Sequence, residues 1–238
     1  MSKNVTDAWQ LNTGSLQEKC DQFEKYARRQ SISRFLARYE LFKLQLDVKG
    51  SIVEGGVHHG AGLMGWAKLS SALEPYALHR WVVGFDTFAG FPSIAEQDND
   101  TECDNPHRHM GGFDTGYDVY QELSLLTSDY NENRYLNQFD KIKLIKGDVA
   151  HSIPQFLVDN PHFLVSLLVC DFDLYEPTRI MLEHLVPRMP AGAVLVFDEV
   201  NNASWPGETL AMLEHFAKQR VKLKKFPFDP NIAYVILE

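Results

Sequence analysis

The feature of this sequence that most restricts its fold is a series of short, almost continuous apolar runs that alternate with helical segments. Five runs are expected to be strands, at residues 51–54, 81–86, 142–148, 164–171 and 193–198. Segments with helical periodicity follow three of them, at Gly62–Leu73, Pro177–Arg188 and Glu208–Gln219. Strands that are apolar on both faces and joined through helices form a parallel sheet with helices on both sides.

The C-terminal part of the chain adds two further expected strands, Val221–Phe226 and Ile232–Leu237. The segment between them, Pro-Phe-Asp-Pro-Asn, is too short to hold a crossover helix. Strands joined in this way are antiparallel neighbours. The sequence therefore predicts an α/β fold with a doubly wound, mostly parallel seven-stranded sheet.

The N-terminal part of the chain has a different pattern. Apolar residues recur at helical spacing over Leu16–Leu46, which predicts one or two amphipathic helices. We therefore expect an N-terminal helical region at residues 1–48 and the α/β domain at residues 49–238. Arginines such as Arg34 and Arg38 interleave with the apolar positions, and we interpret them as a solvated helix face.

A long polar segment follows the second expected strand. Residues 92–138 are rich in Asp, Asn, His and Gly, and they show little apolar pattern before residue 117. An insertion of this length in a compact domain commonly serves function. We expect a lid over a site rather than a second domain.

The charge balance narrows the range of partners. Lys and Arg total 23 against 32 Asp and Glu, which gives a formal net charge of -9. A surface of this sign repels nucleic acid and anionic lipid, so neither is an expected partner. The N-terminus lacks the apolar segment of a signal peptide, and the longest apolar stretch, Phe163–Cys170, is too short to cross a membrane. We expect a cytoplasmic protein with a small-molecule substrate.

Ligands of open α/β sheets bind outside the carboxyl ends of the strands, where this chain places most of its chemistry. The first strand reaches Glu54 and enters a turn with glycines at 55, 56, 60 and 62, which is not the G-x-G-x-x-G spacing of hydride-transfer cofactors. Asp86, after the second strand, is placed to accept hydrogen bonds from both ribose hydroxyls of a nucleoside. Asp148, after the third, is placed to accept from an adenine amine or to cap the turn that follows.

Four more acids follow the fourth and fifth strands. Asp171 and Asp173 lie on one side of an extended segment, and Asp198 and Glu199 follow the strand expected beside it. Clustered carboxylates suit hard cations such as Mg²⁺ rather than zinc. The alternative is that these side chains face apart and cap separate helices.

Several segments together resemble the macrocin O-methyltransferase family. They occur in register from about residue 50 to residue 220, and their sequences are IVEGGVHHG (52–60), GFDTFAGFP (84–92), GDV (147–149), CDFDLYEPT (170–178) and VFDE (196–199). The resemblance implies the Rossmann-like fold of class I methyltransferases, with S-adenosylmethionine and Mg²⁺ as cofactors. It also implies methylation of a sugar hydroxyl.

The resemblance further implies roles for individual positions. Asp173 would be the catalytic base that accepts the proton of the substrate hydroxyl. Residues that would hold S-adenosylmethionine are Glu54, Gly55, Gly56, Asp86, Thr87, Asp148, Val149 and Asp171. Residues that would bind the metal are Asp171, Asp198 and Glu199, the last of which replaces the Asp that many members of the family have.

Residues 201–209 resemble relatives that act on nucleotide-linked deoxysugars, so such a sugar or a glycosylated natural product is the expected substrate. Two alternatives remain open at this point. One is a metal-dependent catechol or phenol O-methyltransferase, which aromatic residues in the lid would favour. The other is a Rossmann-like protein that binds nucleotide sugars without catalysis. The apolar surface of the N-terminal helices also suggests a homodimer.

Overall fold

The structure is a computed structural model that describes residues 3–99 and 105–238. Its centre is a seven-stranded sheet in the order β3-β2-β1-β4-β5-β7-β6. The strands are β1 (Ser51–Gly55), β2 (Val82–Asp86), β3 (Ile142–Lys146), β4 (Val165–Cys170), β5 (Val194–Phe197), β6 (Lys224–Phe226) and β7 (Asp229–Ile236). The first five are parallel, and β7 runs antiparallel to both β5 and β6. The predicted fold class is therefore confirmed.

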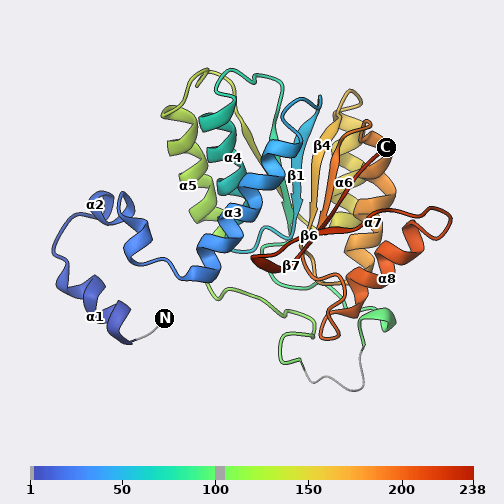
Figure 1. Cartoon of the computed structure of the whole chain (residues 1–238), viewed down its shortest axis with the longest axis horizontal. Coiled ribbons are helices and arrows are strands. Elements are labelled where there is room, and N and C mark those ends of the chain that lie inside the picture. The colour runs from blue at the N-terminus through green and yellow to red at the C-terminus, as the bar shows by residue number, and fades with distance from the viewer. Residues whose placement is uncertain (1–2, 100–104) are drawn as a thin grey trace.

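Helices cover both faces of the sheet (Figure 1). One layer consists of α3 (Arg29–Leu44), α4 (Ala61–Leu73) and α5 (Val119–Glu132), and the other of α6 (Val149–Asp159), α7 (Tyr175–Leu185) and α8 (Pro206–His215). Consecutive strand residues pack against opposite layers of helices. Ile52 lies in the core between the sheet and α3, α4 and α5, and Val53 lies in the core between the sheet and α6, α7 and α8. Strands buried on both faces produce the continuous apolar runs of the sequence.

The sequence pattern does not predict α6. Pro154 lies inside this helix, and proline normally argues against a helix interior because it lacks a backbone donor. The apolar spacing of Val149, Ile153 and Phe156 nevertheless places all three side chains in the core. Asp148 caps the first turn by accepting a hydrogen bond from the Ala150 amide at 2.9 Å. Burial and the cap together outweigh the proline.

The N-terminal region begins with α1 (Lys3–Leu11), α2 (Leu16–Cys20) and the short helix η1 (Phe23–Lys25). Figure 1 shows α1 and α2 extending away from the body of the domain, and α1 buries none of its residues. In contrast, α3 packs against α4 and β7. The boundary at residue 48 and the homodimer remain predictions. Within the described ranges, no helix is long and apolar enough to cross a membrane.

The expected lid, residues 92–138, contains the short helix η2 (Glu96–Asp98) and α5, while residues 100–104 lie outside the described part of the chain. A third short helix, η3 (Val186–Arg188), extends the end of α7. The function of residues 92–138 as a lid remains a prediction.

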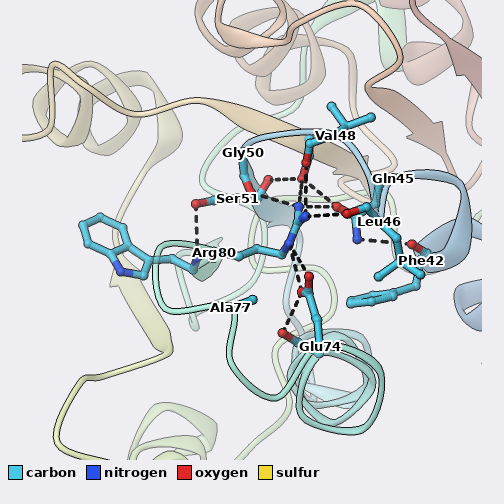
Figure 2. A network of polar contacts seen from close by, with 12 residues as sticks. Phe42, Gln45, Leu46, Val48, Gly50, Ser51, Glu74, Ala77 and Arg80 are labelled. Carbon is cyan, nitrogen blue, oxygen red and sulfur yellow. Dashed lines mark hydrogen bonds and ion pairs between the residues drawn. The ribbon is translucent and has the colours of Figure 1, made fainter. Parts of the chain in front are cut away.

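A buried arginine fixes the C-terminal end of α3 (Figure 2). Arg80, just before β2, donates hydrogen bonds to Gln45, to the carbonyl oxygens of Val48 and Gly50, and to other partners at the amino ends of the strands. Its Nε also lies 2.9 Å from a carboxylate oxygen of Glu74. This network joins the segment after α3 to α4 and the sheet. It therefore fixes the position of α3, whose N-terminal half lies at the carboxyl ends of the strands.

Candidate active site

The carboxyl ends of the parallel strands open into one cavity of about 490 Å³. Neighbouring strands end in register there, because Cys170 pairs with Phe197 and the Asp198 amide donates to the Cys170 carbonyl at 3.2 Å. The cavity is lined by nine of the residues singled out in the sequence, namely Gly56, Asp86, Thr87, Asp148, Val149, Asp171, Asp173, Asp198 and Glu199. The structure thus brings them together, while their individual roles remain predictions.

The turn after β1 requires glycine at its tightest point. Gly56 has φ +83, and a Cβ at this position would lie 1.8 Å from the carbonyl oxygen of Asp171. The turn therefore passes directly against the end of β4, which no other residue type would allow. The next turn residue but one, His58, donates its backbone amide to Asp86 Oδ2 at 2.8 Å. The glycine turn is in this way tied to the strands on both sides of it.

Two residues predicted to bind the cofactor, Glu54 and Gly55, are not among the described residues that line the cavity. Glu54 is 2% exposed and lies under the start of α4, where a Cβ on Gly62 would come within 1.9 Å of Glu54 Oε1. Burial raises the pKa of Glu54 to about 8, more than the nearby charge of Arg38 lowers it. Its Oε2 atom has no hydrogen-bond partner in the described structure.

Asp86 and Asp148, the two acids predicted to contact a nucleoside, both line the cavity. Asp86 accepts backbone hydrogen bonds on both oxygens, from His58 and, at 2.7 Å, from Phe88. Each carboxylate oxygen has a further lone pair, so ribose hydroxyls can still bind. Asp148 serves as the cap that the sequence left as its alternative role, yet it also lines the cavity. Thr87 shapes the same turn by donating to the Gly90 carbonyl at 2.6 Å.

The two acids after β4 differ in their surroundings. Burial raises the pKa of Asp171 to about 6, although Arg34 and Arg38 lower it. Burial, together with the charges of Asp171 and Glu199, raises the pKa of Asp173 to about 8. Asp173 also has φ +62, a left-handed conformation that aspartate tolerates better than most residues. The end of β4 therefore presents, on a left-handed backbone, a carboxyl group whose raised pKa suits proton transfer near neutral pH.

Asp198 does not face the cavity unpaired. Arg34 Nη1 forms an ion pair with Asp198 Oδ1, and Arg34 Nε lies 3.0 Å from Asp229 Oδ2 at the start of β7. The interpretation of Arg34 as part of a solvated helix face is therefore wrong, since its side chain is only 24% exposed. Helix α3 crosses the sheet so that its N-terminal half meets the strand ends, and the helical period alone cannot reveal that crossing.

Glu199 is held from several directions. Its side chain accepts hydrogen bonds from Asn202 and, at 3.4 Å, from Asn231, and its amide donates to Glu208 Oε1 at 2.9 Å. Glu208 is fully buried, and burial raises its pKa well above the ordinary value. The sequence reasoning missed Glu208. The available signal was a carboxylate in the first turn of a helix that follows an acidic strand end.

The acids at the ends of β4 and β5 are of the type that the predicted metal ion requires. Asp171, Asp198 and Glu199 supply the hard oxygen donors that Mg²⁺ prefers, and burial, with a smaller contribution from Glu199 and Asp86, raises the pKa of Asp171. However, among the described residues no three acid, His or Cys side chains are gathered closely enough to hold an ion. Arg34 supplies the cation for Asp198 instead. The donor atoms are therefore of the type that binds a divalent cation, but among the described residues the side chains are not gathered closely enough to hold one.

Aromatic rings form part of the cavity wall, which the sequence reasoning did not foresee. Phe88, Phe91 and Phe113 line the cavity. Phe113 lies against Phe91 and Trp205, with ring centroids 5.5 Å and 5.7 Å away. Phe88 and Phe113 both have positive φ, at 54 and 60. Such strain in residues other than glycine is commonly retained at binding sites.

Comparison with known proteins agrees with this geometry. The model of the macrocin-O-methyltransferase family matches residues 39–225, which is most of the chain. The chain belongs to the macrocin-O-methyltransferase family. The predicted resemblance is thereby confirmed, and the matched range contains every predicted site residue.

Individual methyltransferases are also similar to this chain. The crystal structure of CalS11, calicheamicin methyltransferase, has a TM-score of 0.91 and 31% sequence identity, and the match covers 98% of this chain and 90% of that chain. An apo structure of CalS11, described as a TDP-rhamnose 3'-O-methyltransferase, has a TM-score of 0.83, 28% identity, and coverage of 98% and 91%.

A more distant relative comes from Streptomyces olivaceus. It is 8-demethyl-8-(2,3-dimethoxy-alpha-L-rhamnosyl)-tetracenomycin-C 4'-O-methyltransferase, and it is 26% identical over 153 residues, which is 64% of this chain. The match spans 53% of that relative, so this chain covers about half the length of the curated protein.

Proposed function

We propose that this protein is an S-adenosylmethionine-dependent O-methyltransferase that acts on a sugar hydroxyl. The observation that carries the proposal is the charge of the cavity. Its lining contains no Lys or Arg among the described residues, and its acids are Asp86, Asp148, Asp171, Asp173, Glu176, Asp198 and Glu199. At the strand ends where these acids lie, such a charge favours a sulfonium cation over the phosphates of a dinucleotide cofactor.

The placement of the methyl donor follows from the strand ends. Asp86 would accept the two ribose hydroxyls, and Asp148 with Val149 would contact the adenine. The turn at Glu54, Gly55 and Gly56, with Thr87 and Asp171 beside it, would hold the amino acid part. Backbone atoms of this turn face the cavity at Gly56, which supports an approach through the main chain rather than through Glu54.

The chemistry that this chain can supply is proton removal and orientation. The acceptor oxygen forms a bond to the methyl carbon while the bond from carbon to sulfur breaks, which leaves S-adenosylhomocysteine and a methyl ether. Asp173 would accept the hydroxyl proton on a carboxylate oxygen. The surrounding cavity would align the two reactants and exclude water.

A divalent cation, with Mg²⁺ as the expected ion, would be held by Asp171, Asp198 and Glu199. When bound, it would make adjacent acceptor hydroxyls more acidic. The surplus of carboxylates at the ends of β4 and β5 supports this site, and the ion pair of Arg34 with Asp198 Oδ1 would compete with the ion for the same carboxylate.

For the acceptor we propose a deoxysugar, linked to a nucleotide or to a larger product. The relatives support a sugar, since one is described as acting on TDP-rhamnose and another on a rhamnosyl group. A second candidate is a catechol or phenol acceptor, which the aromatic wall of Phe88, Phe91 and Phe113 favours. Flat rings bind such acceptors, but they stack equally well on a nucleobase.

One experiment separates these possibilities. Transfer of labelled methyl groups from S-adenosylmethionine is measured with nucleotide deoxysugars, glycosylated products and catechols, each with and without Mg²⁺. We expect turnover with a sugar acceptor. Turnover confined to catechols would replace the acceptor assignment, and calorimetry without heat for either S-adenosylmethionine or S-adenosylhomocysteine would exclude the enzyme class.

A further inference from the structure

The start of α7 is capped by a residue from a distant part of the chain. Leu174, at the cap position, has an aliphatic side chain and cannot bond the free amides of the first turn. Asp98 of η2 takes this role, because its Oδ1 accepts the Tyr175 amide at 2.7 Å. The two residues are 77 positions apart in the sequence, and the bond is buried.

The Asp98 carboxylate is fixed on its other sides as well. Its Oδ2 accepts the Ala95 amide at 3.0 Å, and the residue is only 1% exposed. At Gly207, near the start of α8, a Cβ would lie 1.9 Å from Asp98 Oδ1 and 2.5 Å from the Tyr175 amide nitrogen. Glycine is therefore required at position 207. Three segments, namely η2 and the starts of α7 and α8, meet at this one carboxylate.

The bond between Asp98 and Tyr175 lies close in sequence to Asp173, the proposed base. Asp173 precedes Tyr175 by two residues and holds a left-handed backbone at φ +62. A non-glycine residue keeps such a conformation only where the chain on both sides is fixed. Upstream, the Asp171 amide donates to the Gly55 carbonyl at 3.0 Å. Downstream, the next fixed point is the bond from Tyr175 to Asp98.

The same segment also forms part of the cavity wall. The chain leaves the cavity after Ser93 and reaches Asp98 a few residues later. Phe91 in turn contacts Trp205, with ring centroids 5.9 Å apart, just before α8. The first part of residues 92–138 is thus anchored on the two helices that follow the acidic strand ends.

We propose that Asp98 is a positioning residue, which holds the backbone of Asp173 in its left-handed conformation and couples the placement of the polar insertion to that of the base. This inference rests on the proposed role of Asp173. It assigns a function in the reaction to a buried aspartate outside the cavity lining.

The test compares Asp98→Ala with Asp98→Asn. The alanine variant loses the cap, and we expect kcat to fall by roughly tenfold to a hundredfold, because small misplacements of a reacting group have effects of this size. The asparagine variant keeps an acceptor oxygen for the Tyr175 amide, so it should recover most of the activity. Affinity for S-adenosylmethionine, measured by calorimetry, should change by less than about threefold, since Asp98 touches none of the proposed cofactor residues.

Asp118→Ala is the matched control. Asp118 is also an aspartate cap within the polar insertion, since it accepts the Gln121 amide at the start of α5, but it is exposed and caps its own helix rather than α7. We expect near-normal kcat for this variant. Hydrogen exchange gives a second readout, in which Asp98→Ala should speed exchange of the Tyr175 amide and Asp118→Ala should not.

The outcomes separate this inference from the proposed function. Normal kcat in Asp98→Ala, with wild-type methyl transfer intact, would overturn the positioning role alone. Absence of methyl transfer in the wild type would overturn the proposed function and this role with it. If Asp98→Ala does not fold, Asp98→Glu keeps the charge but moves the carboxylate by one methylene group away from the Tyr175 amide, and unchanged kcat in that variant would overturn the inference.

Discussion

Arg34 of α3 forms an ion pair with Asp198 at the end of β5, across 164 positions of sequence. The same guanidinium group reaches Asp229 at the start of β7. A positively charged side chain therefore lies where the sequence predicts that a metal ion is bound. The N-terminal helix and the acidic strand ends are thus parts of one electrostatic unit.

This relationship predicts a competition between arginine and metal. Arg34→Met should increase the affinity of the protein for Mn²⁺, used as a probe in place of Mg²⁺, by about tenfold, which corresponds to about 1.4 kcal/mol. The reason is that Asp198 would no longer need to leave a partner before it binds the ion. Electron paramagnetic resonance of free Mn²⁺ measures the affinity.

Lys43→Met on the same helix is the control, because Lys43 pairs with Glu40 in an exposed position. Its Mn²⁺ affinity should equal that of the wild type. Equal affinities for Arg34→Met and the wild type would contradict the competition. Failure of every variant to bind Mn²⁺ would instead contradict the metal site, and EDTA would then leave methyl transfer unchanged.

Asp173→Asn should remove the proton acceptor while preserving the shape of the site. We expect kcat to fall by at least about a hundredfold, as is usual when a general base is lost. Affinity for S-adenosylmethionine should remain near that of the wild type. Steady-state kinetics and calorimetry together give both quantities.

Glu176→Gln is a matched control, since Glu176 also lines the cavity but pairs with Arg179 on the outer side of α7. It should keep most of its activity. An Asp173→Asn enzyme that works as fast as the Glu176→Gln enzyme would show that another group accepts the proton.

The sequence predicted the acidic strand ends because their convergence follows from topology alone. Parallel neighbouring strands end at the same edge, so Asp171 and Asp198 had to meet once β4 and β5 were adjacent. Arg34 and Asp98 could not be found in this way. Their contacts depend on the angle at which α3 crosses the sheet and on the path of a loop, and neither leaves a periodic signal.

The burial of a charged side chain is a second feature that the sequence pattern could not predict. Glu208 lies in the first turn of α8, in a segment that resembles any exposed first turn, where an acid is favourable by itself. The packing of α8 against α7 and η2, together with the contact to the Glu199 amide, accompanies its removal from water. The predicted helix was therefore correct in type, while the environment of its first acid had to come from the tertiary structure.

The buried carboxyl group of Glu54 predicts a dependence of stability on pH. Its pKa is about 8 in the folded protein against an ordinary value of 4.5, so folding favours the protonated form. The resulting stabilisation is fully present below about pH 4.5 and is lost as the pH rises through about 8. Glu54→Gln, which stays neutral, should remove on the order of 3 kcal/mol of this pH dependence.

Urea unfolding of the ligand-free protein at pH 5, 6, 7 and 8 measures the effect as the difference between variant and wild type. This difference isolates Glu54 from the other buried acids. Glu122→Gln, an exposed substitution on α5, should leave the slope unchanged. Parallel curves for Glu54→Gln and the wild type would contradict the assigned protonation.

The network around Arg80 predicts the largest loss of stability. Arg80→Met leaves the Glu74 carboxylate without its ion-pair partner and removes the hydrogen bonds that Arg80 donates to Gln45 and to backbone carbonyls (Figure 2), which should cost about 3–5 kcal/mol. For a chain of this size the melting temperature should fall by roughly 6–20 °C. Arg179→Met is the control, since its ion pairs are exposed and should contribute less than about 1 kcal/mol. Because Arg80 lies at the opposite edge of the sheet from the cavity, affinity for S-adenosylmethionine in the folded variant should stay close to normal, and a selective loss of that affinity would refute this separation of roles.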